Sequence, residues 1–326
     1  MKLATFESGQ GNRIGVIKGE QVGDIGVFLH LLAKRSIAVG EQPGLKAAVS
    51  TLLSAGPPPQ DMIALLERGD SWLAALDEVV SAIAEGCGSA GEEPSVFIPV
   101  ESVRLRAPIS RPGKIACVGL NYALHAREQD RDPPRKPVFF LKSNNTICGP
   151  GDPIVLPINS NEVDYEAEFA VVIGKRGKRI PVEKAFEHIV GYMILNDVTA
   201  RDMQYGDRQW FRGKSCDTFG PTGPWIVTKD EIPDPENLGI SLTLNGKTMQ
   251  DSRTSDLIFK IPFLISYLSQ SLTWEVGDVL STGTPGGVGR YRQPPVYLQA
   301  GDNVSVTVEK IGTLSNPVVG PEFDGV

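Results

Sequence analysis

The sequence predicts a β-rich α+β fold, and three observations lead to that prediction. The chain has 326 residues, including 35 glycines and 25 prolines, enough for the many turns of a protein built mainly from strands. Short apolar runs separated by Gly and Pro turns predominate over the last two thirds of the sequence. Helical periodicity is concentrated in residues 43–85, so we expect the chain to form two domains of different character.

The first domain is expected to span residues 1–107. Residues 2–30 have the pattern of short strands broken by SGQGN and KGEQ, and helices are expected to follow from residue 43. Residues 86–94, GCGSAGEEP, have the composition of a linker. The chemically suggestive residues all lie beyond this domain, so we expect it to be a small accessory α/β domain.

The second domain is expected to span residues 108–326 and to consist mainly of strands. Helical patterns within it are short and lie near residues 121–129, 182–188 and 255–269.

Composition and charge exclude several classes of protein. The net charge is −7, from 32 basic and 39 acidic residues without a basic stripe, so a nucleic acid is not an expected partner. Neither a secretory leader nor a membrane span is apparent, so we expect no membrane partner and a cytoplasmic location. The four cysteines, which form no C-x-x-C pair, fit neither a zinc ribbon nor a disulfide framework: Cys87, Cys117, Cys148 and Cys216.

The segment VDYEAEFAVVIG, residues 163–174, places acids at the start of an apolar strand. Alternation along a strand directs Asp164, Glu166 and Glu168 to one face. Two carboxylates at i and i+2 repel each other unless a positive charge lies between them. A solvated strand end explains this segment, taken alone, as well as a binding site does.

A third acid favours the binding site. Asp197 directly follows the apolar run IVGYMILN, where an unpartnered charge is not expected. With Glu166 and Glu168 it makes an all-oxygen ligand set suited to Mg²⁺ or Mn²⁺, with Ca²⁺ as a substitute. Arg201 and Gln204 follow Asp197 at positions +4 and +7 and would align with it on a helix. Asp164 is expected to be solvated or to support the other acids.

Of the three histidines, His125 is the one that we single out. It lies in GLNYALHARE, where Asn121 can cap a short helix and Glu128 shares its face with His125. A carboxylate fixes the tautomer of a neighbouring imidazole, as a general base requires. Taken alone, the pair fits an exposed, solvated helix better. His30 and His188 are expected to be structural.

Two further segments carry candidate substrate contacts. Lys214 precedes a rigid Gly/Pro stretch, and Thr284 lies at the centre of the glycine-rich segment VGDVLSTGTPGGVG. The latter lacks the GK[ST] ending of a P-loop, so it is not expected to bind a nucleotide. Its backbone N–H groups can hold a carboxylate, although a plain β-turn is an equally good interpretation.

Taken together, these segments resemble the fumarylacetoacetate hydrolase family. The similarity covers nearly all of residues 108–317, through GLNYALHARE, PVFFLKS, VDYEAEFAVVIG, GYMILNDVTARDMQ, KSCDTFGPTGPW, TLNGKTMQDSRTSDLIF, LTWEVGDVLSTGTPGGVG and GDNVSVTVEKIGTLSN. The resemblance implies a mixed β-sandwich roll as the catalytic domain, assembled as a homodimer.

The resemblance also implies roles for individual residues. Glu166, Glu168 and Asp197 would bind the metal, and His125 with Glu128 would activate water. The segment QDRDPPRKP would belong to a mobile lid. Four residues fall at positions that contact the substrate or its oxyanion: Arg201, Gln204, Lys214 and Thr284. The sequence departs from the family pattern at Cys216, where an aromatic residue is more usual, and in a lid with more charges than is typical: Asp130, Arg131, Asp132, Arg135 and Lys136.

The function that these residues and the resemblance favour is metal-dependent hydrolysis of a carbon–carbon bond in a β-diketo acid. Such an acid could be an acylpyruvate, fumarylacetoacetate, fumarylpyruvate or a sugar-derived diketo acid. The alternative is isomerisation or decarboxylation of a 2-oxo acid through an enolate on the same scaffold. A third interpretation, from a different class, is a non-catalytic, metal-stabilised binding domain.

Overall fold

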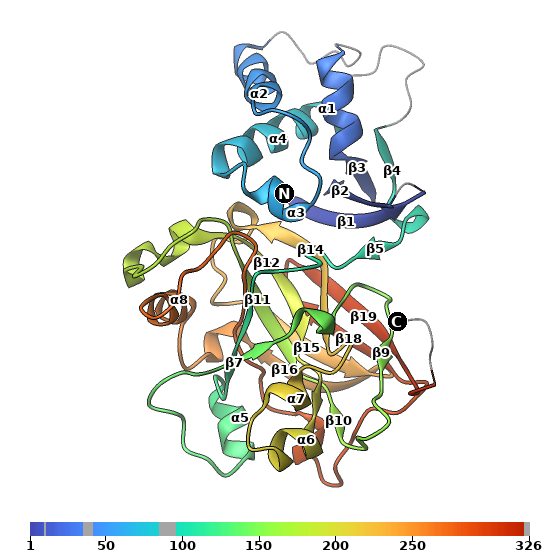
Figure 1. Cartoon of the computed structure of the whole chain (residues 1–326), viewed down its shortest axis with the longest axis vertical. Helices are drawn as coiled ribbons and strands as arrows, with labels where there is room; N and C mark the ends of the chain where they lie inside the picture. Colours follow the sequence, from blue (N-terminus) through green and yellow to red (C-terminus); the bar gives the residue numbers. More distant parts are fainter. Residues whose placement is uncertain (10, 35–41, 85–95, 323–326) are drawn as a thin grey trace. The chain divides into compact units, whose positions relative to one another are not determined.

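The computed structural model describes residues 1–9, 11–34, 42–84 and 96–322, which form two compact units, 1–106 and 107–326. The expected linker at 86–94 lies outside the described residues, as does Cys87. Figure 1 shows the first unit in blue to teal and the second in the colours that follow.

The first unit contains an antiparallel sheet in the order β4-β3-β2-β1, with β5 paired to β1. Its strands are β1 Lys2–Ser8, β2 Gly11–Lys18, β3 Gln21–Asp24, β4 Phe97–Pro99 and β5 Leu105–Arg106. Its helices are α1 Ile25–Ala33, α2 Pro43–Ser54, α3 Met62–Leu66, α4 Asp70–Ala82 and the 3-10 helix η2 Val100–Ser102.

The expectation of strands throughout residues 2–30 is wrong beyond Asp24. The Asp24 side chain accepts the Val27 N–H at 3.0 Å, and this cap starts helix α1. His30 therefore lies in the last turn of a helix, with an exposed side chain.

The second unit is built on a mixed sheet in the order β14-β12-β11-β17-β6-β7, in which only the β17–β6 pair is parallel along this path. Its strands are β6 Ile115–Gly119, β7 Val138–Lys142, β11 Ala167–Ile173, β12 Ile189–Asn196, β14 Gly220–Thr228 and β17 Val279–Ser281. Strand β8, Ile147–Cys148, runs parallel to β14. Every residue of β11 and β12 is buried, so these two strands form the centre of the unit.

A second sheet, in the order β16-β15-β18-β19-β9, shares its core with the first. Its strands are β9 Ile154–Val155, β15 Gly239–Leu244, β16 Lys247–Arg253, β18 Asn303–Val308 and β19 Gly312–Val319. Phe169 and Ile194 of the first sheet belong to the same buried apolar cluster as Leu242 and Val306 of the second. The predicted β-rich α+β class, with two sheets enclosing one core, is confirmed.

Short helices lie around these sheets. They are α5 Ala123–Glu128, α6 Arg201–Gly206, α7 Phe211–Lys214 and α8 Ile261–Ser269, with 3-10 helices η3 Asn144–Thr146, η4 Val182–His188, η5 Lys229–Glu231, η6 Thr254–Asp256 and η7 Gly289–Tyr291. The helix expected over 255–269 is divided, because Pro262 is accommodated in the first turn of α8 and η6 precedes it. A two-stranded ladder of β10 Val163–Asp164 and β13 Thr199–Ala200 lies near α6.

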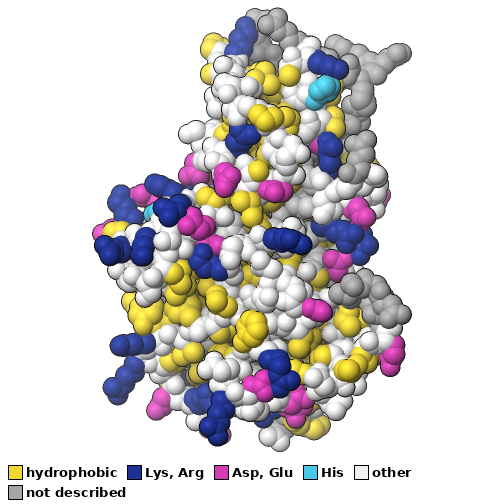
Figure 2. Space-filling view, in the orientation of Figure 1, with side chains coloured by type: hydrophobic (Ala, Val, Ile, Leu, Met, Phe, Trp, Pro, Cys, Tyr) yellow, Lys and Arg dark blue, Asp and Glu magenta, His cyan; other side chains and the backbone are white. Residues whose placement is uncertain are grey.

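Over the face of the molecule drawn in Figure 2, basic and acidic side chains are interspersed. Among the described helices, none is both long and apolar enough to cross a membrane.

Candidate functional site

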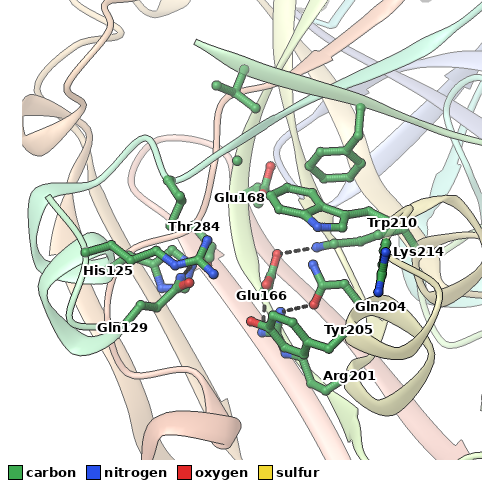
Figure 3. Close-up of a pocket in the computed structure, with 16 residues that line it drawn as sticks. His125, Gln129, Glu166, Glu168, Arg201, Gln204, Tyr205, Trp210, Lys214 and Thr284 are labelled. Carbon is green, nitrogen blue, oxygen red and sulfur yellow. Dashed lines mark hydrogen bonds and ion pairs between the residues drawn. The ribbon is translucent and has the colours of Figure 1, made fainter. Parts of the chain in front are cut away.

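A cavity of about 190 Å³ in the second unit brings the predicted site residues together. Its wall contains His125 from α5, Glu168 from β11, Gln204 from α6 and Lys214 from α7. In Figure 1 these three helices lie at the same end of the unit. Figure 3 shows His125 and Gln129 on one side of the cavity, the α6 and α7 residues on the other, and the two glutamates between them.

Three buried acids form a compact group on this wall. One carboxylate oxygen each from Glu166, Glu168 and Asp197 lies within 4.8 Å of the others. The main chain holds the acids together, because the Asp197 N–H donates to the Glu166 carbonyl oxygen (2.9 Å) and the Glu166 N–H to the Asn196 side chain (3.0 Å). Three oxygen ligands at this separation suit a hard divalent cation.

Asp164 does not join this group, and its side chain is fully buried rather than solvated. The chain leaves regular strand geometry between β10 and β11, so the simple alternation of faces breaks down at Glu166. Asp164 instead accepts hydrogen bonds from Arg201 Nε (2.8 Å) and from the N–H groups of Gly289 (2.7 Å) and Arg290 (3.1 Å). It therefore orients Arg201 beside the acids.

Buried cations neutralise part of the acidic group. Lys214 Nζ lies 2.7 Å from Glu166 Oε2 and 2.6 Å from Asp197 Oδ2, and Arg201 Nη2 lies 2.7 Å from Glu166 Oε1. Lys142 Nζ lies 2.7 Å from Asp197 Oδ1. Sequence reasoning missed Lys142, although a lysine at the end of the apolar run PVFFL was a usable signal.

Glu168 is the acid that these cations leave unpaired. Among the described residues its carboxylate has no basic partner, and Oε2 accepts hydrogen bonds from the Ser281 hydroxyl and the Gly283 N–H (2.5 and 3.0 Å). Burial raises the pKa of Glu168 well above its usual range, and nearby Asp197 and Glu166 raise it further.

Glu166 behaves in the opposite way. Burial tends to raise its pKa, but Lys214 and Arg201 outweigh that effect and hold the pKa below the usual range. A buried carboxylate without a basic partner, beside two that are paired with cations, has the electrostatics that a bound cation relieves. The donor set therefore fits Mg²⁺ or Mn²⁺, with Glu166, Glu168 and Asp197 as the residues that can hold it.

His125 is buried, with 5 % of its surface exposed, so the exposed-helix interpretation is wrong. Its Nδ1 lies 2.6 Å from Glu128 Oε1, and Gln129 Nε2 lies 2.9 Å from its Nε2. Glu128 as an acceptor fits the tautomer that carries its proton on Nδ1, with the Gln129 amide donating to Nε2. Nε2 is then an acceptor on the cavity side, which is the state that a general base requires.

The expectation that Asn121 caps this helix is also wrong. Tyr122 occupies the cap position without a side-chain hydrogen bond. The Asn121 side chain instead donates to the carbonyl oxygens of Phe259 and Thr282 (3.1 and 2.8 Å) and fixes the chain before α5.

The glycine-rich loop after β17 holds carboxylates through its backbone. The N–H of Gly283 donates to Glu168 (3.0 Å) and that of Gly287 to Glu128 Oε2 (2.8 Å). The Gly289 N–H of the same loop donates to Asp164. One loop thus positions Glu168 of the metal group, Glu128 beside His125 and Asp164 beside Arg201. The backbone of this loop thus holds carboxylates of the chain itself, while its contact with the substrate stays a prediction.

The two remaining residues that were predicted to contact the substrate, Gln204 and Thr284, also line the cavity. Gln204 accepts a hydrogen bond from Arg201 Nη1 (3.1 Å) on the same face of α6, whereas Asp197 lies before that helix and is not aligned with it. Thr284 lines the cavity and accepts from Gln250 Nε2 (2.8 Å). Gln250 was not singled out in the sequence. Its Oε1 accepts the Ala167 N–H (2.9 Å), which ties β11 to the loop.

Comparison with known proteins agrees with this arrangement. Residues 114–319 match the family described as "Fumarylacetoacetate (FAA) hydrolase C-terminal". The rat protein "Oxaloacetate tautomerase Fahd2a, mitochondrial" is 43% identical over 283 residues, which are 86% of this chain and 87% of that protein. The mitochondrial name of this relative gives no support to the expected cytoplasmic location.

Solved structures of the same fold cover nearly the whole chain. A fumarylacetoacetate hydrolase from Exiguobacterium antarcticum is 34% identical, with a TM-score of 0.76 over 98% of this chain and 99% of that one. A maleylpyruvate hydrolase from Sphingobium, solved with manganese(II) and pyruvate, is 30% identical, with a TM-score of 0.73 over 99% and 100% of the two chains. The protein therefore belongs to the fumarylacetoacetate hydrolase family of enzymes.

Proposed function

We propose that this enzyme catalyses the keto–enol tautomerisation of a small 2-oxo acid, with oxaloacetate as the best candidate. The observation that carries the proposal is the His125 imidazole, whose Nε2 faces the cavity while Glu128 holds Nδ1 at 2.6 Å. A neutral imidazole in this state can take a proton from carbon and return it to oxygen. The 43% identity to an oxaloacetate tautomerase supports the same reaction.

The cation expected at Glu166, Glu168 and Asp197 would supply Lewis acid polarisation of the 2-oxo group. The residues of the chain then account for the proton. His125 removes a proton from the carbon next to the keto group, the C–H electron pair becomes the C=C bond, and the proton goes to the former keto oxygen. Atoms balance without water or a leaving group.

Buried donors assist at the oxygen on which charge develops. Lys214 and Arg201 are held in place by Glu166, and donors fixed in this way require little rearrangement during the reaction. Glu128 stabilises the imidazolium that forms transiently on His125.

The relatives favour the second of the two functions expected from the sequence. Hydrolysis of a β-diketo acid was the preferred function, whereas the oxaloacetate tautomerase relatives favour the isomerase alternative. Hydrolysis remains the second candidate, because the maleylpyruvate hydrolase shares the fold and a His–Glu pair can equally activate water. The third reading, a non-catalytic domain, finds no support in these relatives.

Product analysis separates the candidates. The Mn²⁺-loaded protein is incubated with oxaloacetate and, separately, with an acylpyruvate, and the products are identified by NMR and mass. Faster keto–enol exchange of oxaloacetate without CO₂ or pyruvate supports the proposal. Two acids formed from the acylpyruvate would identify a hydrolase, and CO₂ from oxaloacetate a decarboxylase.

The homodimer, the mobile lid and the accessory role of the first domain stay predictions.

A further inference from the structure

Two arginines line the solvent-exposed end of the cavity. Arg131 follows helix α5, and Arg208 lies between α6 and α7. Both side chains are exposed, whereas Glu166 and Lys214 in the same wall are buried. The cavity therefore has an inner end with the three-acid group and an outer end with two guanidinium groups.

Neither outer guanidinium is neutralised. Among the described residues, Arg131 and Arg208 have no acidic partner within ion-pair distance. Asp207, which precedes Arg208, is engaged by Arg212 at 2.5 Å. Asp130 and Asp132 flank Arg131 in the sequence, but neither lines the cavity.

The inner cations differ in this respect. Arg201 pairs with Asp164 and Glu166, and Lys214 pairs with Glu166 and Asp197. Among the described cations of the cavity wall, the outer pair thus differs from Arg201 and Lys214 in having no acidic partner of its own.

The backbone holds both arginines at this position. Asp130 has φ +51° and Arg208 φ +60°, in the left-handed region that residues with a Cβ disfavour. The Arg131 N–H donates to the Ala126 carbonyl oxygen (3.1 Å) and closes the end of α5. Such strained positions persist where the surrounding structure fixes them, and they concentrate at binding sites.

The outer wall carries no negative charge among its described members. The uncharged residues that line the cavity beside the arginines include Gln129, Tyr205 and Trp210. An occupant whose 2-oxo acid end lies at the three-acid group would direct its far end toward the exposed part of the cavity that Arg131 and Arg208 line, and a carboxylate is the group that arginine binds best.

We propose that Arg131 and Arg208 bind the second carboxylate of the substrate, so that the enzyme selects 2-oxo dicarboxylic acids over 2-oxo monocarboxylic acids. The proposal rests on the proposed function for the orientation of the substrate, but it concerns recognition and not the proton transfer. It is therefore tested by binding, with ligands that cannot tautomerise.

The test compares L-malate with L-2-hydroxybutyrate, in which a methyl group replaces the distal carboxylate. Both are titrated calorimetrically into the Mn²⁺-loaded full-length protein and into its Arg131→Gln, Arg208→Gln and double variants. Arg127→Gln is the matched control, because Arg127 is also exposed and close to the site on α5 but does not line the cavity. Mn²⁺ affinity is measured for each variant first.

We expect the wild type and Arg127→Gln to bind malate at least about tenfold more tightly than 2-hydroxybutyrate, as charge-assisted hydrogen bonds imply. In the double variant the ratio should approach one while 2-hydroxybutyrate affinity is retained. A ratio that survives in the double variant, an equal loss of both ligands, or absence of malate binding to the wild type would overturn the proposal. Selection of malate through the arginines in a protein that fails to tautomerise oxaloacetate would refute the proposed reaction alone.

Discussion

Glu128 is bound at both carboxylate oxygens, Oε2 by the Gly287 N–H at 2.8 Å and Oε1 by His125 Nδ1 at 2.6 Å. The glycine-rich loop and the proposed base are therefore one positioned assembly. Movement of the loop at Gly287 would rotate Glu128 and, through it, the imidazole.

Gly287→Ala tests this coupling. Gly287 has φ +103°, and a Cβ there would lie 2.3 Å from the Met249 carbonyl oxygen. The loop must shift, so we expect kcat to fall by roughly tenfold or more, with a loss of about 1–3 kcal/mol in the free energy of unfolding. Steady-state kinetics and urea unfolding provide the two measurements.

Gly246→Ala is the control for this substitution. Gly246 also has a positive φ, +78°, but nothing lies within 4 Å of its added Cβ. It should lose about 1–2 kcal/mol of stability through backbone strain alone and retain wild-type kcat. Equal kcat in both variants would show that the loop does not position the base.

Glu168→Gln tests the metal site without breaking an ion pair. Both hydrogen bonds to Glu168 end on one oxygen, Oε2, so a glutamine can keep them. We expect Mn²⁺ affinity to fall by roughly a hundredfold or more, because a charged ligand is lost. The metal-free variant should unfold at the wild-type urea concentration or higher, since repulsion from Asp197 and Glu166 is relieved.

Glu166→Gln gives the contrasting result. It removes the partner of Lys214 and Arg201, both of which are buried. Breaking such a pair costs about 3–5 kcal/mol, so this variant should be destabilised even without metal. Identical metal-free stabilities for the two variants would contradict the division of roles described here.

Metal addition should stabilise the wild-type protein. At a free Mn²⁺ concentration of 100 Kd the gain is about 2.7 kcal/mol. For a chain of 326 residues that corresponds to a rise in Tm of roughly 4 °C. Differential scanning calorimetry with Mn²⁺ and with EDTA measures the shift. Glu168→Gln should show little of it, and an equal shift in that variant would place the cation elsewhere.

Much of the site could be predicted from the sequence, because unusual residues in apolar surroundings are visible there. Asp197 after an apolar strand, together with Glu166 and Glu168, indicates a group of three acids, and the structure brings these three together. Local spacing also paired His125 with Glu128, which are in contact across one helix turn.

The features that could not be predicted from the sequence depend on tertiary contacts between distant residues. The burial of Asp164 depends on N–H groups contributed by residues more than a hundred positions later, Gly289 and Arg290. Lys142 and Gln250 act through partners brought close only by the sheets. The expectation that His125 is exposed is wrong for the same reason, since Gly287 and Tyr291, which contact α5, come from a distant segment.

The geometry of His125 supplies the base, and the relatives favour tautomerisation among the reactions that such a base can serve. A histidine held by a glutamate beside a group of acids suits hydrolysis and tautomerisation alike. A direct measurement of proton transfer without carbon–carbon bond cleavage separates the two reactions.

The most direct test follows the enol form of oxaloacetate by its ultraviolet absorbance as it approaches the keto–enol equilibrium. The Mn²⁺-loaded wild type should accelerate this approach without forming CO₂ or pyruvate. His125→Ala should bind Mn²⁺ with unchanged affinity and lose about 10²–10⁴-fold in rate. A His125→Ala variant that binds Mn²⁺ and retains the wild-type rate would contradict the account, because the proton would then be moved by another group.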